Sequence, residues 1–377
     1  MKFRLNEEQQ ILSDTLNRLL EKHYDFDTRK KLAATERGYS ERNWRTFGDL
    51  GLLGINIAEE FGGLSGNAVD ALIVMEAMGR HLVVEPFLST AIVSANIITS
   101  GGSQAMKEFV LPKMVNGDYK MAIATLEPQA RFDLWDIKTH VAKDGEAHLL
   151  TGSKAVVLNG DTADGLIVSA RGSESLHSGQ GVTLYLVDPR TPGVTIRGFP
   201  NIDGTRSAEI TLTNVKVNAD AIIGTERQGY PILENAFDRG LAALASEAVG
   251  AMSRLYELTV EFLKNRKQFG QPLAHFQVLQ HRMADMLIAI EQARAITLYA
   301  TSKLDEPDVA IRRKAASAAK AVIGRSARYV GQQAVQLHGG MGMTDELSVG
   351  YYFKRLTCID MTWGNTDHHT DLYGNAL

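Results

Sequence analysis

The stretch Asn265-Arg266-Lys267-Gln268-Phe269-Gly270-Gln271-Pro272-Leu273 indicates the fold and the chemistry of this chain more clearly than any other. A helix that ends in a basic side chain runs into a Phe-Gly-x-Pro break, and a second helix then begins near the amide side chain of Gln277. Arg266 presents a planar fork of N–H donors that suits a diphosphate, and Gln277 can bond either a donor or an acceptor. Packing alone does not require this combination. The stretch therefore predicts a ligand-binding element between two helices.

The composition is that of an ordinary globular protein. The chain has 377 residues, of which 44% are hydrophobic and 22% charged, and this length allows two or three domains. A formal net charge of -4 gives no electrostatic reason to expect nucleic acid or an anionic membrane as a partner. The single cysteine, Cys358, excludes an intrachain disulfide and a thiolate metal cluster.

No secretory signal and no membrane span are expected. Arg4, Glu7 and Glu8 place charges where a secretory signal needs an apolar run. The most apolar region, residues 82–99, is interrupted by Glu85 and Pro86 and is too broken to cross a bilayer. A cytoplasmic or matrix-like location is therefore the expectation.

The hydrophobic period changes twice along the chain. It is helical from about residue 6 to 115, alternates in short segments between about 119 and 217, and is helical again from Pro231 onward. The alternating part carries turn signals and predicts a small β-barrel or sandwich. The predicted α+β architecture has a helical domain, a small β-barrel or sandwich domain and a second helical domain, at residues 1–118, 119–224 and 225–377.

This order of domains, together with several local motifs, resembles the acyl-CoA dehydrogenase family over essentially the whole chain. The resemblance implies an N-terminal α-helical domain, a middle β-barrel and a C-terminal four-helix bundle. It also implies FAD as the cofactor, α,β-desaturation of an acyl-CoA substrate, and electron-transfer flavoprotein as the electron acceptor. The motifs are Gly51-Leu52-Leu53-Gly54, Glu59-Glu60-Phe61-Gly62-Gly63, Glu127-Pro128 with Asp133, residues 266–280, and Gln336-Leu337-His338-Gly339-Gly340-Met341-Gly342.

The resemblance also implies which residues contact the flavin. In the family, an Arg-x-x-Phe-Gly motif and a Gln-x-x-Gly-Gly loop reach across a dimer interface to the diphosphate and adenosine end of the neighbouring subunit's flavin. Glycine in that loop permits close backbone approach to phosphate oxygens. The matching cofactor-binding residues are Arg266, Phe269, Gln277, Gln336, Gly339 and Gly340.

The catalytic positions of the family are occupied by other residue types. The Glu of the family's Glu-Gly-Thr motif aligns with Trp363, which cannot accept a proton, while Gly364 keeps the register. The alternative base position of some relatives falls on Gly240. Hydroxyl side chains that face the isoalloxazine ring are replaced by Leu126 and Leu158. One half of a flavin site is therefore expected and the other half is absent.

The same middle segment differs at two further positions. Val156 stands in place of a Trp, and Phe132 in place of a loop Ser. Thr125 lies one residue from Leu126 and would supply a hydroxyl if the register slips by one. That alternative keeps open a functional flavin ring site in this chain.

The subfamily resemblance favours a heteromeric enzyme. Residues 126–133, and the string Phe353-Lys354-Arg355-Leu356 leading to His368-His369, are similar to the small subunit of pimeloyl-CoA dehydrogenase and to subunits of heteromeric steroid side-chain dehydrogenases. The leading hypothesis is a heterotetramer whose second acyl-CoA dehydrogenase-like subunit supplies the flavin wall and the catalytic Glu.

Three alternatives remain. A homotetrameric dehydrogenase would use Asp367 as its base if a dry pocket raised the pKa of that carboxyl. A non-catalytic scaffold or acyl-CoA-binding subunit would share no flavin site, and a flavin monooxygenase is a more distant possibility. Asp238 is interpreted as a helix-start residue that caps the helix or contacts CoA.

Other titratable residues favour structural interpretations. His338 and the pair His368-His369 lack carboxylate or Cys neighbours at ligand spacing, so solvated or capping roles are expected rather than metal binding. Glu247 is expected to form an internal ion pair. Glu76 and Glu85 are expected to be structural acids.

Overall fold

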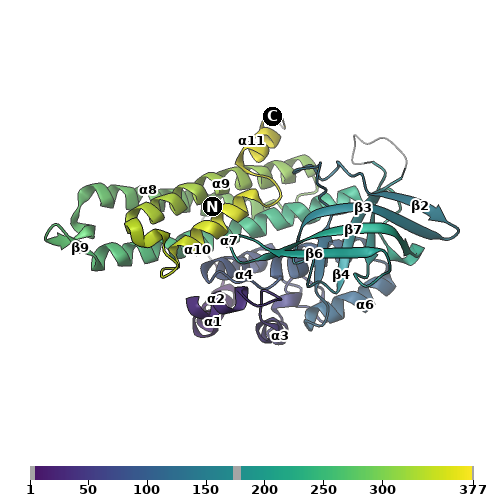
Figure 1. The fold of residues 1–377 in the computed structure, drawn as a ribbon, viewed down its shortest axis with the longest axis horizontal. Coiled ribbons are helices and arrows are strands. Elements are labelled where there is room, and N and C mark those ends of the chain that lie inside the picture. Colours follow the sequence, from purple (N-terminus) through teal and green to yellow (C-terminus); the bar gives the residue numbers. More distant parts are fainter. Residues whose placement is uncertain (1–4, 173–179, 376–377) are drawn as a thin grey trace. The chain divides into compact units, whose positions relative to one another are not determined.

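The computed structural model describes residues 5–172 and 180–375 of the chain (Figure 1). Arg4 lies outside the described residues. Along the chain, helices come first, then strands, then helices again, so the predicted fold class is confirmed.

The chain packs into two compact units that do not follow its linear order. The helical unit contains the segments 1–31, 68–83 and 241–377, and the sheet unit contains 32–67 and 84–240. Each unit therefore combines parts that lie far apart in the sequence. The three predicted domain boundaries remain a prediction.

The sheet unit is built on one mixed eight-stranded sheet. The strand order is β6-β7-β3-β2-β4-β5-β8, and β1 pairs in parallel with β4. Side chains such as Leu150, Val168 and Ile210 are fully buried and form its core, because alternate residues of each strand point to the same face. The strands are β1 (Met121–Ala124), β2 (His140–Asp144), β3 (Ala147–Leu158), β4 (Gly165–Arg171), β5 (Val182–Val187), β6 (Val194–Pro200), β7 (Arg206–Val217) and β8 (Ile222–Ile223).

Short helices complete the sheet unit. Ser40 and Ser103 cap two of them, since each side chain accepts a hydrogen bond from a first-turn backbone N–H. Trp44 is fully buried and its indole N–H donates to the Gly117 carbonyl oxygen at 3.0 Å. The helices are α3 (Glu41–Asp49), the π-helix η3 (Leu88–Ser94), α5 (Ala95–Gly101) and α6 (Gln104–Val115).

The helical unit centres on α9 (Val309–His338), which packs against three other helices. These are α8 (Gln277–Ser302), α10 (Val349–Met361) and α11 (Thr366–Asn375), and Figure 1 shows α8 and α10 beside α9. Small buried residues such as Ala315 and Ala319 allow this close packing. The unit also contains α1 (Glu7–His23), most of α2 (Phe26–Ala33), and α4 (Ala68–Arg80).

Helix α7 (Tyr230–Asn265) begins in the sheet unit and ends in the helical unit. In the helical unit it approaches α4 so closely that glycine is required at two positions. A Cβ atom on Gly79 would lie 1.9 Å from the Glu247 carbonyl oxygen, and one on Gly250 would lie 1.9 Å from the Glu76 carbonyl oxygen. The two backbones therefore touch at this crossing.

The position of Asp238 differs from the sequence-based interpretation. Because α7 begins at Tyr230, Asp238 lies about two turns inside the helix and cannot cap its start. The side chain is 2% exposed. Its predicted contact with CoA stays a prediction.

Candidate functional site

The segment after α7 forms a tight hairpin. Strands β9 (Lys267–Gln268) and β10 (Gln271–Pro272) pair antiparallel across Phe269 and Gly270, which both have positive φ. This is the geometry of a two-residue hairpin turn of the primed type. The Phe-Gly-x-Pro break is thus a turn that reverses the chain from α7 to α8.

The hairpin and the end of α9 share one cavity in the helical unit. The cavity has a volume of about 670 Å³, within the usual range for small-molecule sites. Four of the predicted cofactor residues lie in its wall, namely Arg266, Gln336, Gly339 and Gly340. The full lining is Phe262, Arg266, Leu273, Val278, Leu279, Arg282, Gln336, Leu337, His338, Gly339, Gly340 and Met341.

The other two predicted cofactor residues lie outside this lining. Phe269 is 88% exposed at the hairpin turn, where its ring meets the Phe276 ring edge-on at a centroid distance of 6.1 Å. Gln277 is exposed at the first position of α8. Neither side chain faces the cavity in the isolated chain.

Two guanidinium groups at the cavity are unpartnered. Within residues 5–172 and 180–375, neither Arg266 nor Arg282 has a side-chain hydrogen bond or ion pair. Both side chains are exposed, so their charges are solvated. The cavity therefore offers two planar, permanently charged forks to an anionic ligand.

Sequence reasoning missed Arg282. It is one of four charged residues on α8, and only the folded chain shows that it is unpartnered and lines the cavity. Helical spacing was the available signal, because Leu279 and Val278 lie three and four residues before Arg282 and so share its face of the helix.

The loop after α9 brings bare backbone to the cavity. Gly339 ends the helix with φ 59° and ψ -141°, a conformation that L side chains rarely adopt. A Cβ atom added to Gly339 or Gly340 would meet nothing within 4 Å. The space that side chains would fill is therefore open to a ligand, as the approach of a phosphate group requires.

His338 is buried in the cavity wall, so of the two roles expected for it, solvated or capping, the solvated one is wrong. The side chain is 5% exposed and lines the cavity. Nδ1 lies 2.8 Å from the Ala334 carbonyl oxygen, and the ring stacks on Phe262 with centroids 4.3 Å apart. Burial lowers the pKa of His338, although the bond to Ala334 partly opposes this shift.

Buried side chains donate hydrogen bonds to the backbone of the turn that carries Trp363. It connects α10 to α11, and both Trp363 and Gly364 have positive φ. Lys320 is fully buried and its ammonium donates to the Asp360 carbonyl oxygen at 2.8 Å and to the Gly364 carbonyl oxygen. Burial lowers the pKa of Lys320 to about 7, with Asp360 acting in the opposite direction.

His369 supports the same turn. Its Nε2–H donates to the Trp363 carbonyl oxygen at 3.0 Å, and the side chain is 2% exposed. Burial, reinforced by the Lys320 charge, lowers the pKa of His369 to about 3. Of the two roles expected for His369, solvated or capping, the solvated one is therefore wrong here as well.

Asp367 lies in the first turn of α11 and is exposed. The isolated chain therefore does not enclose this carboxylate in a dry pocket. Its role as a base stays a prediction.

The middle segment presents hydrocarbon at the positions where the resemblance implies hydroxyls. Leu126 and Leu158 are half-buried, and Val156 is 54% exposed beside a bulge in the β3–β7 pairing. The Ala155 N–H donates to the Leu126 carbonyl oxygen at 2.9 Å, which joins the two parts of this surface. Thr125 is buried, and its hydroxyl has no partner among the described residues.

A buried ion pair lies beneath the Glu127-Pro128 loop. The Lys154 ammonium donates to Glu127 at 2.7 Å and to the Ser169 carbonyl oxygen at 2.7 Å. Glu127 also accepts the backbone N–H groups of Lys138 and Thr139. Burial alone would raise the pKa of Glu127, but Lys154 and these hydrogen bonds outweigh it and lower the pKa to about 2.

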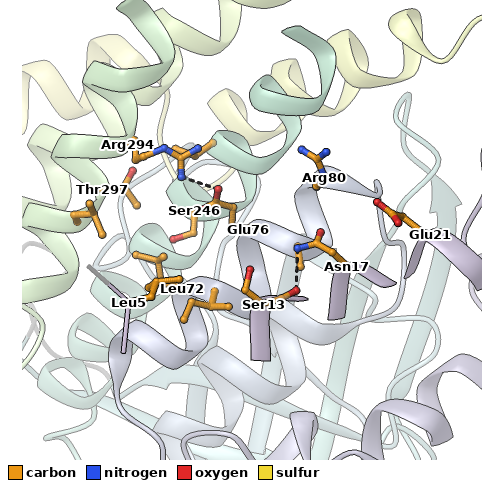
Figure 2. Close-up of a pocket in the computed structure, with 14 residues that line it drawn as sticks. Leu5, Ser13, Asn17, Glu21, Leu72, Glu76, Arg80, Ser246, Arg294 and Thr297 are labelled. Carbon is orange, nitrogen blue, oxygen red and sulfur yellow. Dashed lines mark hydrogen bonds and ion pairs between the residues drawn. The ribbon is translucent and has the colours of Figure 1, made fainter. Parts of the chain in front are cut away.

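A second cavity of about 460 Å³ lies among α1, α4, α7 and α8 in the helical unit (Figure 2). In its wall, Arg294 bonds Glu76 at 2.6 Å, and Arg80 bonds Glu257 through two contacts of 2.7 Å. These pairs neutralise its arginines, in contrast to Arg266. The expectation that Glu76 is a structural acid is confirmed.

Glu247 also has the expected structural role. The side chain of Arg355 forms two hydrogen bonds with it, at 2.6 and 2.8 Å, and Glu247 is 3% exposed. The pair joins α7 to α10 within the helical unit.

None of the described helices is long and apolar enough to cross a membrane. In the described part of the chain, no cluster of three His, Cys, Asp or Glu side chains is arranged to hold a metal ion.

The chain thus has a helical part, a mixed sheet and a second helical part. An arginine-lined cavity lies in the second helical part, between the hairpin after α7 and the end of α9. The N-terminal, middle and C-terminal domains described for acyl-CoA dehydrogenases match residues 6–118, 122–215 and 227–377. The chain belongs to the acyl-CoA dehydrogenase family. Members of this family are FAD-dependent oxidoreductases.

Several known proteins are similar over most of the chain. The mitochondrial long-chain specific acyl-CoA dehydrogenase of Sus scrofa is 33% identical, over 80% of this chain and 71% of its own length. Butyryl-CoA dehydrogenase from Megasphaera elsdenii superposes with a TM-score of 0.91 at 28% identity, covering 100% of this chain and 99% of its own. A variant of the Tcur3481-Tcur3483 steroid ACAD superposes with a TM-score of 0.89 at 27% identity, covering 98% and 97%.

Proposed function

We propose that this chain is one subunit of a heteromeric, FAD-dependent acyl-CoA dehydrogenase that desaturates the α,β bond of an acyl-CoA thioester. A second dehydrogenase-like subunit supplies the catalytic Glu and the wall around the flavin ring. This chain supplies the residues that hold the diphosphate end of the flavin. The subfamily we propose is that of the pimeloyl-CoA dehydrogenase small subunit and the heteromeric steroid side-chain dehydrogenases, with electron-transfer flavoprotein as acceptor and a cytoplasmic location.

The observation that carries this proposal is the pair of unpartnered arginines at one glycine-rimmed cavity. The guanidinium groups of Arg266 and Arg282 can each donate two parallel hydrogen bonds to phosphate oxygens. Gly339 and Gly340 leave space for a phosphate to approach the backbone. The residues present therefore fit the diphosphate of FAD. When bound, FAD would supply the hydride acceptor of the reaction.

The assignment of the catalytic groups to a partner subunit follows from the groups that this chain lacks. Desaturation needs a base for the α-proton, and Trp363 at the family's base position has no basic group. Leu126 and Leu158 cannot donate the hydrogen bonds that hydroxyls give to the ring. A partner that carries these groups completes the site.

Exposed apolar side chains support assembly with such a partner. Val278, Leu287 and Ile288 on α8 are 61%, 42% and 55% exposed, and Phe269 at the hairpin is almost fully exposed. Apolar groups of this size are typical of a surface that is covered in an assembly. The similar Tcur3481-Tcur3483 enzyme also carries a two-component name.

The test is to purify the chain alone and after co-expression with a dehydrogenase homologue encoded beside it that retains the catalytic Glu. We expect a colourless lone chain and a yellow complex that an acyl-CoA reduces. Replacing that partner's Glu with Gln should abolish reduction while the flavin stays bound. A lone chain that is yellow, homotetrameric and reduced by an acyl-CoA would refute the proposal, and loss of that activity in Asp367→Ala would establish the homomeric alternative.

The flavin content of the complex separates the proposal from a scaffold role. A shared site requires that Arg266→Gln in this chain lowers the flavin content of the complex. Unchanged flavin content in that variant, with the complex intact by size-exclusion chromatography, would favour a non-catalytic scaffold.

A further inference from the structure

We propose that His338 is a recognition residue of the same cavity, whose Nε2 atom accepts a hydrogen bond from a hydroxyl or amino group on the adenosine portion of the ligand. This inference rests on the proposed function, because it assumes a nucleoside diphosphate in the cavity. It assigns a ligand contact to a residue for which the sequence predicted only a solvated or capping role.

The protonation pattern of the ring follows from its partner. Nδ1 lies 2.8 Å from the Ala334 carbonyl oxygen, which can only accept a hydrogen bond. Nδ1 therefore carries the proton, and in the neutral ring Nε2 is an acceptor. No described residue is within hydrogen-bonding distance of Nε2.

The orientation of the ring is fixed on three sides. Phe262 stacks on its face with an interplanar angle of 30°, and Ala334 holds Nδ1 from the preceding turn of α9. Gly342 packs against the base of the side chain, since a Cβ atom there would lie 3.1 Å from the Cβ of His338. A ligand thus meets an acceptor whose position is set before binding.

This acceptor complements the other polar side chains of the cavity. Arg266 and Arg282 have only N–H donors, which suit phosphate oxygens but cannot accept from a hydroxyl or an amine. The amide of Gln336 can do both, but its side chain is exposed and its orientation is not fixed by burial. His338 is therefore the buried group that distinguishes a nucleoside diphosphate from a bare diphosphate. Burial keeps the ring neutral and able to accept.

Two substitutions separate the acceptor from the anchor. In His338→Asn the side-chain amide can still donate to Ala334, but no atom reaches the position of Nε2. In His338→Gln the longer side chain places an oxygen or nitrogen near that position. His275→Asn, at an exposed histidine of the hairpin region, is the matched control.

The experiment measures binding of ADP and of inorganic pyrophosphate to the full-length chain by calorimetry. We expect His338→Asn to weaken ADP binding about 3- to 10-fold, the worth of one neutral hydrogen bond, while pyrophosphate binding stays the same. His338→Gln should recover most of the ADP affinity, and His275→Asn should match the wild type. Thermal unfolding of each variant checks that the fold is retained.

Three results would overturn the inference. They are equal losses of ADP and pyrophosphate affinity in His338→Asn, no loss of either, and a wild-type chain that binds pyrophosphate as tightly as ADP. The proposed function is judged separately, by the flavin content of the co-expressed complex. A yellow complex with an unchanged His338→Asn variant would refute this inference alone.

Discussion

Charged side chains have opposite roles in the sheet unit and in the cavity of the helical unit. In the sheet unit, Lys154 and Glu127 are buried against each other, and backbone groups satisfy what remains of their hydrogen-bonding capacity. At the cavity, Arg266 and Arg282 have no partner among the described residues. A charge that is satisfied internally stabilises the chain, whereas an unsatisfied charge beside a cavity is available to a ligand.

The turn that carries Trp363 combines internally satisfied polar groups with a side chain that lacks the expected proton acceptor. Lys320 and His369 hold the backbone of the turn, so its shape is maintained by buried polar groups. The side chain at the family's base position is nevertheless an indole. If this turn corresponds to the family's catalytic loop, as the resemblance implies, it keeps the backbone support of that loop without a proton acceptor, in agreement with the proposed division between two subunits.

The largest effect is expected from breaking the buried pair in the sheet unit. Lys154→Met leaves the Glu127 carboxylate buried without its cation, and such a loss costs about 3–5 kcal/mol of unfolding free energy. Urea denaturation measures the change. The double variant Lys154→Met/Glu127→Gln should recover most of it, because no uncompensated charge remains. Equal losses in the single and double variants would show that packing, and not charge, explains the effect.

The cavity arginines should behave in the reverse way. Arg266→Gln and Arg282→Gln each remove a charge-assisted contact worth about 1.5–3 kcal/mol, so ADP affinity of the full-length chain should fall about 10- to 100-fold. The unfolding free energy should change by less than about 0.5 kcal/mol, since neither side chain has an internal partner.

Arg18→Gln, at an exposed arginine of α1, controls for the loss of one positive charge. It should leave ADP affinity unchanged. A stability loss of several kcal/mol in either cavity variant would contradict the contrast between the two regions.

The fold could be predicted from the sequence because its periodicities are long and regular. The change from helical to alternating spacing near residue 119 corresponds to the start of the strands at Met121, and the return near Pro231 corresponds to the start of α7. The placement of Asp238 failed, because a buried helix that is apolar on several faces does not show where it begins.

The site could be predicted only in part. Arg266 and the 336–340 loop belong to recognisable motifs, and the structure brings them to one cavity. Arg282 and His338 were missed as site residues, because their roles depend on which groups lack partners once the chain is folded. Pairing of this kind is a tertiary property that local spacing does not encode.

Buried histidines should make the stability of the helical unit depend on pH. Burial lowers the pKa of His369 to about 3 and that of His81 to about 4. Between these values and the ordinary pKa near 6.5, the unfolded chain binds protons that the folded chain does not. The unfolding free energy should therefore be highest above pH 6.5 and fall below it, by up to about 1.4 kcal/mol per pH unit for each histidine.

Between pH 5 and 6.5 the slope reflects the histidines whose pKa burial lowers, His338 included, because the lowered pKa of Glu127 makes that carboxylate lose its contribution only at more acidic pH. Urea denaturation across the window measures the slope. His369→Gln keeps a donor for the Trp363 carbonyl oxygen and should reduce the slope by one proton. A slope that is unchanged in this variant would mean that His369 is protonated in the folded chain.

The smallest effect is expected at Asp367, an exposed charge that belongs to neither region. Its carboxylate lies in the first turn of α11, where its interaction with the helix dipole stabilises the helix by about 0.3–1 kcal/mol. Asp367→Asn should therefore lower the unfolding free energy by no more than that. It should also leave acyl-CoA reduction of the flavin by the complex within about 2-fold of wild type, because the partner subunit is proposed to supply the catalytic base. Loss of a general base would instead cost about 100-fold or more. Stopped-flow flavin reduction measures the rate. A loss of 100-fold or more, with the complex intact, would assign the proton transfer to this chain and would remove the catalytic difference between it and its proposed partner.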